Sequence, residues 1–366
     1  MKLNNIDMKN LGLTEEFIQE SKLYKDLFIG RVSSQFKNLY KVITEKGDIV
    51  AEISGKYHYS VKGISEYPAV GDFVMVDRTN DSQGYGIIHR ILGRKSVFAR
   101  EMAGTKEDIQ IIATNIDTVF ICMSLNDDYN LRRLERYLSI AWDSGAVPVI
   151  VLTKSDLCKD IEVRLNDISS IAIGVEVLVT TSTSDEGHQS LKRFLSSGKT
   201  VAFIGSSGVG KSTLINCLLG QNILDTNGIR DDDKGRHTTT RRELIMLPNF
   251  GVVIDTPGMR ELGIINADLT KSFSDIEELA FDCKFNDCTH LHEPNCAVQK
   301  AIIDGFLSVE RLESYWKLKK ETKYQGLNSK MIEKEKINEM LSSMGGMKNF
   351  RDFRKSIKKK NRKTGR

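Results

Sequence analysis

The chain has 366 residues, which is longer than a single domain core usually grows, so several domains are expected. Its 40% hydrophobic and 28% charged residues are ordinary for a globular protein. No run approaches the roughly 18 consecutive apolar residues of a membrane-spanning helix, so we expect no membrane partner. The first seven residues are polar and lack the apolar core of a signal peptide, which favours a cytoplasmic protein.

The first 26 residues are expected to be a polar, helical lead-in, and β-rich runs follow from about Leu27 to Ile91. These runs are Leu39–Ile43, Ile49–Ile53, Asp72–Val76 and Gly86–Ile91. Their spacing and turn residues predict a small five-stranded barrel over residues 27–105. An OB-fold, which commonly binds oligonucleotides, is one such barrel, but periodicity alone does not separate it from others.

From Asp117 onwards apolar strands alternate with helices, which predicts a parallel sheet flanked by helices over residues 106–272. The expected strands are Thr118–Met123, Val147–Leu152, Glu176–Thr180, Thr200–Ile204 and Val252–Ile254. Helices are expected from Leu131 to Trp142 and from Lys211.

The helix from Leu131 has an apolar stripe with three- and four-residue spacing. The stripe comprises Leu131, Leu134, Leu138 and Ala141, and the charged residues off it are Arg132, Arg133, Glu135 and Arg136. We expect those charges to form a solvated face.

Residues 205–213 match the phosphate-loop pattern, which follows an apolar strand and opens a helix. The loop comprises Gly205, Ser206, Ser207, Gly208, Val209, Gly210, Lys211, Ser212 and Thr213. Its backbone N–H groups are expected to bind phosphate oxygens, Lys211 to neutralise the β and γ groups, and Ser212 to ligate Mg²⁺. A chance glycine-rich turn is the alternative.

Two downstream segments complete the expected nucleotide site. Asp255, at a strand end, is placed near Mg²⁺, and the N–H of Gly258 in the same Asp-Thr-Pro-Gly motif could sense the γ-phosphate. The polar stretch 225–242, between the phosphate loop and this motif, is expected to be a switch loop in which Thr239 or Thr240 completes the Mg²⁺ shell. The threonines could instead form a strand edge leading into Glu243–Leu247.

A guanine-recognition pattern lies at the end of an earlier strand and comprises Thr153, Lys154, Ser155 and Asp156. The carboxylate of Asp156 can accept hydrogen bonds from N1–H and N2–H of guanine, a pair that adenine lacks, so GTP is expected rather than ATP. Lys154 would lie along the base, and a backbone N–H of Thr181 or Ser182 could meet the guanine oxygen. The pattern precedes the phosphate loop, the reverse of the usual order, which indicates a circularly permuted domain.

A cluster of three cysteines and one histidine predicts a tetrahedral zinc site with no open position. Its members are Cys283, Cys288, His290 and Cys296, with His292 as a rival for His290. Such a site is expected to be structural and to stabilise a small helical module over residues 273–335. A metal-free reduced cluster is the alternative.

The net positive charge of the chain is concentrated in the tail, residues 336–366. The chain's net charge is +4, yet residues 348–366 contain ten Lys or Arg and only Asp352 as an acid. Phe350 and Phe353 lie among these basic residues, which favours salt-dependent RNA contact. A solvated end without a partner is the alternative.

Five motifs together resemble the bacterial circularly permuted family called ribosome small subunit-dependent GTPase A. They are Thr-Lys-Ser-Asp at 153–156, the loop 205–213, Gly-Arg-His-Thr-Thr-Thr at 235–240, Asp-Thr-Pro-Gly at 255–258 and the Cys-Cys-His-Cys cluster. The resemblance covers about residues 27–320. It implies an OB-fold, a permuted GTPase domain and a zinc module with His290 as ligand, acting in late maturation of the small (30S) ribosomal subunit.

Met259 follows Gly258, where many GTPases have a glutamine that orients the attacking water. A thioether cannot do this, so slow intrinsic hydrolysis is expected. We hypothesise that His237 or a ribosomal group positions the water, and full ribosome-stimulated turnover of His237→Ala would exclude His237.

The predicted function is therefore GTP hydrolysis stimulated by the 30S subunit, with binding to 16S rRNA and contacts to other small-subunit assembly factors. We expect a monomer. Two alternatives are a P-loop metabolic enzyme that transfers a phosphoryl group, and an RNA-binding protein with a vestigial nucleotide fold. No acceptor site or ATP-specific feature supports the first, and intact Lys211, Ser212, Asp255 and Asp156 argue against the second.

Overall fold

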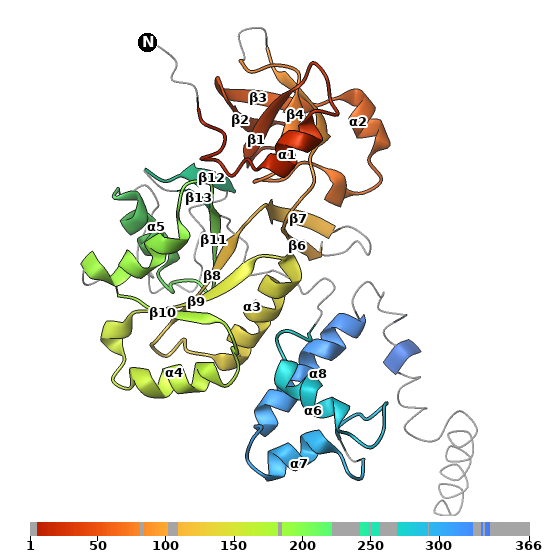
Figure 1. Cartoon of the computed structure of the whole chain (residues 1–366), viewed down its shortest axis with the longest axis vertical. Helices are drawn as coiled ribbons and strands as arrows, with labels where there is room; N and C mark the ends of the chain where they lie inside the picture. Colours follow the sequence, from red (N-terminus) through yellow and green to blue (C-terminus); the bar gives the residue numbers. More distant parts are fainter. Residues whose placement is uncertain are drawn as a thin grey trace, which may run out of the picture. The chain divides into compact units, whose positions relative to one another are not determined.

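The computed structural model in Figure 1 describes residues 6–80, 84–101, 109–181, 185–221, 242–248, 251–255, 269–291, 293–324, 331 and 334–336. By internal contacts, residues 1–103 and 108–322 form one compact unit, and residues 104–107 and 323–366 form another. Among the described helices, none is both long enough and apolar enough to cross a membrane.

The N-terminal part is a closed five-stranded barrel preceded by α1 (Glu15–Ser21). Its strands are β1 (Phe28–Gln35), β2 (Tyr40–Thr44), β3 (Gly47–Ile53), β4 (Phe73–Val76) and β5 (Gly86–Ile91), with α2 (Gly55–Ser60) and η1 (Ile64–Glu66) between β3 and β4. The strand order is β1-β2-β3-β5-β4, and β4 pairs back to β1. Only β3 and β5 run parallel among these pairs. This is the Greek-key order of an OB-fold, so the predicted barrel is confirmed.

Strand β1 was missing from the four runs that the sequence indicates. Its residues Gly30–Ser34 are all buried, so the strand has no alternation of apolar and polar positions. The buried positions include the charged Arg31, which is fully inaccessible to solvent. A continuous buried strand with polar residues in it cannot be recognised from a period of two.

Arg31 joins three segments of the chain. Its guanidinium donates hydrogen bonds to the carbonyl oxygens of Leu11, Gly71 and Asn115, which belong to the lead-in, the barrel and the turn before the α/β sheet. Burial lowers the pKa of Arg31 to about 10, which leaves it charged at neutral pH. Gly71 has φ +97° and a Cβ there would lie 2.2 Å from the Thr114 carbonyl oxygen, so only glycine allows this approach.

A two-stranded hairpin, β6 (Val97–Glu101) and β7 (Ile109–Thr114), connects the barrel to the α/β sheet. The predicted domain boundary between residues 105 and 106 falls inside this hairpin and stays a prediction. The barrel also meets the sheet through one pair of residues, Ser34 of β1 and Glu243 of β12.

The α/β domain has the strand order β10-β9-β8-β11-β13-β12. The strands are β8 (Thr118–Ser124), β9 (Val147–Thr153), β10 (Glu176–Val179), β11 (Thr200–Ile204), β12 (Glu243–Met246) and β13 (Val252–Asp255). All pair in parallel except β12 with β13. The helical segments are α3 (Leu131–Ser144), η2 (Ser155–Leu157), α4 (Ile161–Ser169), η3 (Asp185–Phe194) and α5 (Lys211–Leu219).

The chain builds one side of this sheet first. It passes through β8, β9 and β10 and then returns to β11 beside β8; β12 and β13 follow, with β13 next to β11 and β12 outside it. The switch in direction therefore lies between β8 and β11. In sheets of this kind ligands bind outside the carboxyl ends of the strands at such a switch point, and the predicted nucleotide motifs end β9, β11 and β13.

Helix α3 confirms the predicted apolar stripe but not the predicted solvated face. Leu134, Leu138 and Ala141 are buried as expected. Glu135, however, is only 1% exposed, because its carboxylate accepts a hydrogen bond from Arg311 of α8 at 2.8 Å. The expectation for Glu135 is wrong because its partner lies far along the chain.

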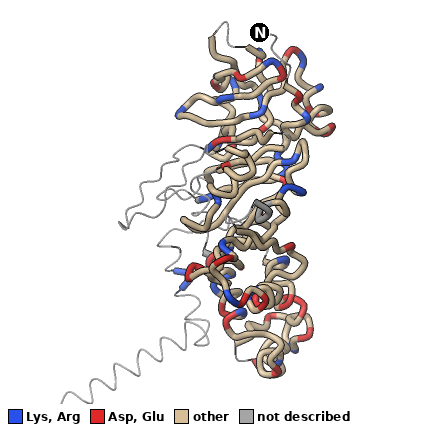
Figure 2. The backbone as a smooth tube through the Cα atoms, turned by 90° about the vertical axis from the view of Figure 1, so that its left-hand side faces the viewer, with Lys and Arg blue, Asp and Glu red and all other residues tan. Residues whose placement is uncertain are grey.

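The C-terminal helices of the compact unit are α6 (Ser274–Phe281), α7 (Ala297–Ile303) and α8 (Val309–Tyr324). Arg311 joins α8 to α6 by donating to Asp275 and to the Ser272 carbonyl oxygen, and the ring of Phe273 packs edge-on against Tyr315. In Figure 2 acidic and basic positions are interspersed along the described chain, and acidic ones are frequent in this helical module. The basic tail 348–366 lies outside the described residues.

Candidate functional site

The phosphate loop lies between β11 and α5 at the centre of the sheet. Gly205 has φ +144°, and a Cβ at this position would lie 2.3 Å from the carbonyl oxygen of Cys122 in β8. Glycine is therefore required where the loop leaves β11 and passes over the neighbouring strand. Because Lys211 and Ser212 begin α5, their backbone lies at the helix N-terminus, which favours an anion.

Lys211 lies across the loop. Its Nζ donates to the carbonyl oxygens of Gly205 at 2.8 Å and Ser206 at 2.6 Å. Asp255 ends β13 nearby; burial raises the pKa of this carboxyl group, and the positive charge of Lys211 acts in the opposite direction. A partly buried carboxylate beside an ammonium group is suited to a cation and a phosphate group bound together.

The base-recognition motif contacts the phosphate loop directly. The Thr153 hydroxyl donates to the carbonyl oxygen of Val209 at 2.6 Å, and Thr153 is only 4% exposed. This bond joins the end of β9 to the loop after β11, on opposite sides of β8. The predicted base-recognition residues and the predicted phosphate loop are thereby held next to each other.

Residues just after β10 hold the segment that contains Asp156. The Thr181 hydroxyl donates to Asp156 Oδ1 at 2.6 Å, and the backbone N–H of Ser155 donates to the Thr180 carbonyl oxygen at 3.2 Å. The sequence suggested a backbone contact from Thr181 to the base; the structure adds a side-chain contact that orients the carboxylate. Lys154 has φ +56°, which turns the chain sharply between Thr153 and Asp156.

Several predicted residues lie outside the described part of the chain. They are Ser182, His237, Thr239, Thr240, Gly258 and His292. The predicted switch loop and its water-positioning and Mg²⁺-binding roles therefore stay predictions.

The sequence missed one contact with the phosphate loop. Arg133, which was expected on a solvated face, donates to the hydroxyl of Ser206. No local sequence pattern marks this contact, because it depends on β8 lying beside β11 in the sheet, which brings the first turn of α3 near the loop.

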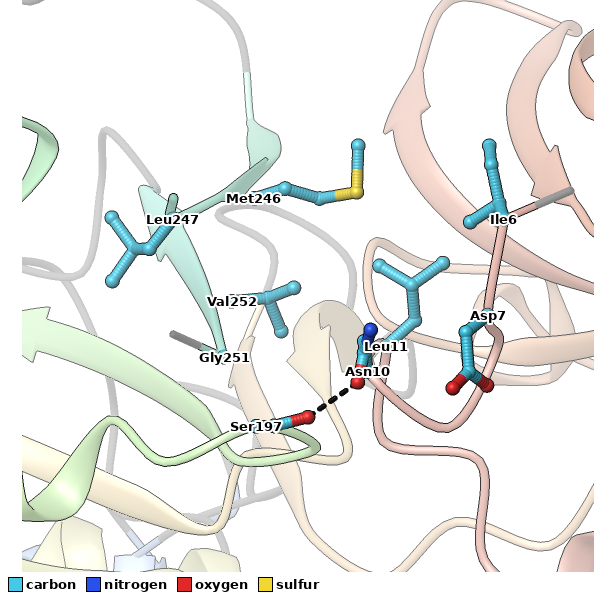
Figure 3. A pocket seen from close by; sticks show the side chains of 9 residues that line it. All are labelled: Ile6, Asp7, Asn10, Leu11, Ser197, Met246, Leu247, Gly251 and Val252. Atoms are coloured by element: carbon cyan, nitrogen blue, oxygen red, sulfur yellow. Dashed lines mark hydrogen bonds between the residues drawn. The ribbon is translucent and has the colours of Figure 1, made fainter. Parts of the chain in front are cut away.

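The cavity in Figure 3 is separate from these motifs. It has a volume of about 330 Å³ and lies between the lead-in and the β12–β13 side of the sheet. It is lined by Ile6, Asp7, Asn10, Leu11, Ser197, Met246, Leu247, Gly251 and Val252. Asn10 and Ser197 are hydrogen-bonded across it. None of its lining residues belongs to a nucleotide motif.

The cysteine cluster forms a compact ligand set. Cys283, Cys288, His290 and Cys296 each offer one ligand atom, and these atoms lie within 4.8 Å of one another. Cys283 Sγ lies 3.8 Å from Cys296 Sγ, and His290 Nδ1 lies 3.6 and 3.5 Å from these two sulfurs. Tetrahedral zinc with Zn–S bonds of about 2.3 Å requires sulfur–sulfur distances of about 3.8 Å. The cluster can therefore hold a metal.

Hydrogen bonds from Gln299 hold two of the residues in the cluster. Cys296 is the N-cap of α7 and its sulfur accepts from the Gln299 N–H, while Gln299 Nε2 donates to the His290 carbonyl oxygen. Burial lowers the pKa of His290, which favours the neutral ring that binds metals.

The comparisons with known proteins decide the family. The family model described as RsgA GTPase matches residues 91–265. The Small ribosomal subunit biogenesis GTPase RsgA 2 of Lactiplantibacillus plantarum is 50% identical over 94% of this chain and 97% of its own length. The chain belongs to the RsgA GTPase family. An RsgA protein of Methanosarcina acetivorans is 43% identical over 93% of both chains.

Solved structures agree with the membership in the RsgA family. YjeQ from Thermotoga maritima has a TM-score of 0.59 and 28% identity, covering 81% of this chain and 98% of its own. YloQ, described as a circularly permuted GTPase, has a TM-score of 0.58 and 26% identity, covering 82% of this chain and 96% of its own. The permuted order predicted from the motifs is confirmed. An ABC transporter model also matches residues 189–351, a range that contains the phosphate loop.

Proposed function

We propose that the protein binds GTP with Mg²⁺, hydrolyses it, and acts in biogenesis of the small ribosomal subunit. The observation that supports this best is the bond from Thr153 to Val209, because it joins a guanine-recognition motif to a phosphate loop. The names of the RsgA relatives, as small ribosomal subunit biogenesis GTPases, support the role on the ribosome.

Each motif has a part in the proposed reaction. The residues 205–213 bind the phosphates, with Lys211 neutralising the β and γ groups, and Asp156 recognises guanine with Thr181 orienting it. Ser212 and one of Thr239 or Thr240 ligate Mg²⁺, and Asp255 lies beside this ion. Gly258 senses the γ-phosphate, and His237 or a ribosomal group orients water. Held by these residues, Mg²⁺ would supply positive charge to the nucleotide's phosphates.

Lys211→Ala tests whether this loop binds nucleotide. We expect affinity for both GTP and GDP to fall at least tenfold, which corresponds to about 1.4 kcal/mol, since a charge-assisted contact to phosphate is lost. Fluorescent nucleotide titration measures it. Lys199→Ala is the control, because Lys199 is half-exposed at the edge of β11 and away from the loop. Unchanged affinity in Lys211→Ala would reject the proposed site.

We propose Zn²⁺ as the metal of the Cys283, Cys288, His290 and Cys296 cluster, with a structural role. Three thiolates and one imidazole leave no open position for a substrate. We expect one zinc per chain by elemental analysis, and Cys288→Ser to lower zinc content and the melting temperature. Full thermal stability of the zinc-free protein would contradict a structural role.

The finer partners are also proposals. The protein would bind 16S rRNA, partly through the tail 336–366, and meet other assembly factors in the cytoplasm as a monomer. The domain limits 27–105, 106–272 and 273–335 belong to the same proposal. Deletion of residues 348–366 tests the tail, because loss of phosphate contacts would make subunit binding less dependent on salt. An unchanged salt dependence would exclude a contribution of the tail to subunit binding.

The two alternative functions have less support. A phosphoryl-transferring enzyme needs an acceptor site, and the cavity of Figure 3 shares no residue with the nucleotide motifs. A vestigial fold would not need Thr153, Asp156 and Thr181 in bonded positions. The proposed function predicts phosphate release from GTP without an acceptor molecule, and neither alternative does, so this measurement separates them.

A further inference from the structure

The start of helix α3 is fixed beside the phosphate loop. The Asn130 side chain caps the helix by accepting from the backbone N–H of Arg133 at 3.0 Å. This places Arg133 in the first turn of α3. Arg133, Leu134, Cys122 and Ser206 of the loop all line one small cavity. The side chain of Arg133 is therefore close to the start of the loop.

The guanidinium group of Arg133 has partners on two sides. It donates to the Ser206 hydroxyl, and on the other side it donates to Asp128, at 2.6 Å to the carbonyl oxygen and 2.9 Å to a carboxylate oxygen. The planar fork of arginine suits such divided contacts, and a lysine has only a point charge. Asp128 thus sets the direction in which Arg133 reaches the loop.

Ser206 is also where Lys211 binds. The Ser206 carbonyl oxygen accepts from Lys211 Nζ at 2.6 Å, while its hydroxyl accepts from Arg133. The preceding residue, Gly205, lies directly against the carbonyl oxygen of Cys122. Three contacts therefore hold the start of the loop. Gly205 lies against β8, the Ser206 hydroxyl accepts from Arg133, and the Ser206 carbonyl oxygen accepts from Lys211.

We propose that Arg133 is a positioning residue of the nucleotide site: through Ser206 it fixes the start of the phosphate loop, and with it Lys211, in the arrangement that binds the β and γ phosphates. This inference rests on the proposed GTP-binding function. Arg133 acts on the loop and not on the attacking water, so it contributes to the binding of both GTP and GDP.

A double-mutant cycle tests the proposal, with Arg133→Ala, Ser206→Ala, the double variant and Arg133→Lys. We expect Arg133→Ala to weaken binding of GDP and of a non-hydrolysable GTP analogue by a similar factor, about tenfold. KM for GTP should rise while kcat stays unchanged, because uniform binding is lost. The double variant should bind nucleotide no more weakly than whichever single variant binds it more weakly, since both changes remove the same contact. Arg133→Lys should restore part of the affinity.

The control is Arg164→Ala, which removes a surface arginine of α4 that packs over Tyr129. We expect it to leave affinity and turnover unchanged. Losses that multiply in the double variant, a fall in kcat at constant KM, or unchanged affinity in Arg133→Ala would each overturn the proposal. Should Arg133→Ala fail to fold, Ser206→Ala and Arg133→Lys still decide it. Wild-type protein that binds no guanine nucleotide would instead reject the proposed function.

Discussion

Asp156→Asn is expected to change the base preference from guanine to xanthine. The carboxylate can accept from N1–H and N2–H of guanine, whereas an amide N–H₂ can donate to the C2 oxygen of xanthine. Two charge-assisted hydrogen bonds would be lost with GTP, at about 1.5–3 kcal/mol each. GTP affinity should therefore fall by about two to four orders of magnitude, because each 1.4 kcal/mol is tenfold.

Competition of GTP, XTP and ATP against a fluorescent guanine nucleotide measures this change. Asp160→Asn is the matched control, because Asp160 is an exposed carboxylate just before α4 and lies outside the motif. If Asp156→Asn keeps full preference for GTP, Asp156 does not recognise the base, despite its bond to Thr181.

Glu135→Ala is expected to give the largest loss of stability among single changes proposed here, about 3 kcal/mol. The Glu135 side chain is fully buried and receives hydrogen bonds from Arg311 at 2.8 Å and from Arg132 at 2.6 and 2.8 Å. Removing the carboxylate leaves the guanidinium of Arg311 with one carboxylate partner fewer, although its side chain is only 3% exposed. Asp275 remains a partner, so the loss should lie at the lower end of the range for broken buried pairs.

Chemical denaturation followed by circular dichroism measures the free energy of unfolding. The double change Glu135→Leu with Arg311→Met should recover much of the loss, because the two most deeply buried charges are then removed together, while Asp275, which loses Arg311, has a side chain that is 20% exposed. Arg136→Ala is the control, because its pair with Glu321 is partly exposed and should cost less than about 1 kcal/mol. A loss in Glu135→Ala no larger than in the control would mean that the buried pair does not stabilise the helical module against α3.

The sequence predicted those parts of the fold and site that depend on local patterns. The alternation of apolar strands and helices placed β8, β9, β11 and α5 within one or two residues of their observed limits. The phosphate loop and the guanine motif each follow a strand, so the common edge of a parallel sheet brings them together. The cysteine spacing similarly places four ligand atoms within one short segment.

Contacts between distant segments could not be predicted in this way. Glu135 and Arg311 are 176 positions apart, and Arg133 and Ser206 are 73 apart, so neither pair leaves a periodic signal. Helical periodicity placed both α3 residues off the apolar stripe, and only the packed structure distinguishes a solvated charge from a buried one. Likewise, the parallel pairing of β3 with β5 identifies the barrel as an OB-fold, a long-range feature that alternation cannot reveal.

The measurement that tests the central claim most directly is phosphate release from GTP by the purified protein alone, with small ribosomal subunits, and with large subunits. The proposal predicts slow release by the protein alone, a marked increase with small subunits, and no increase with large subunits. Lys211→Ala should show no increase with either subunit. Equal rates with small and large subunits, or a high rate without any subunit, would contradict a GTPase that acts on the small subunit.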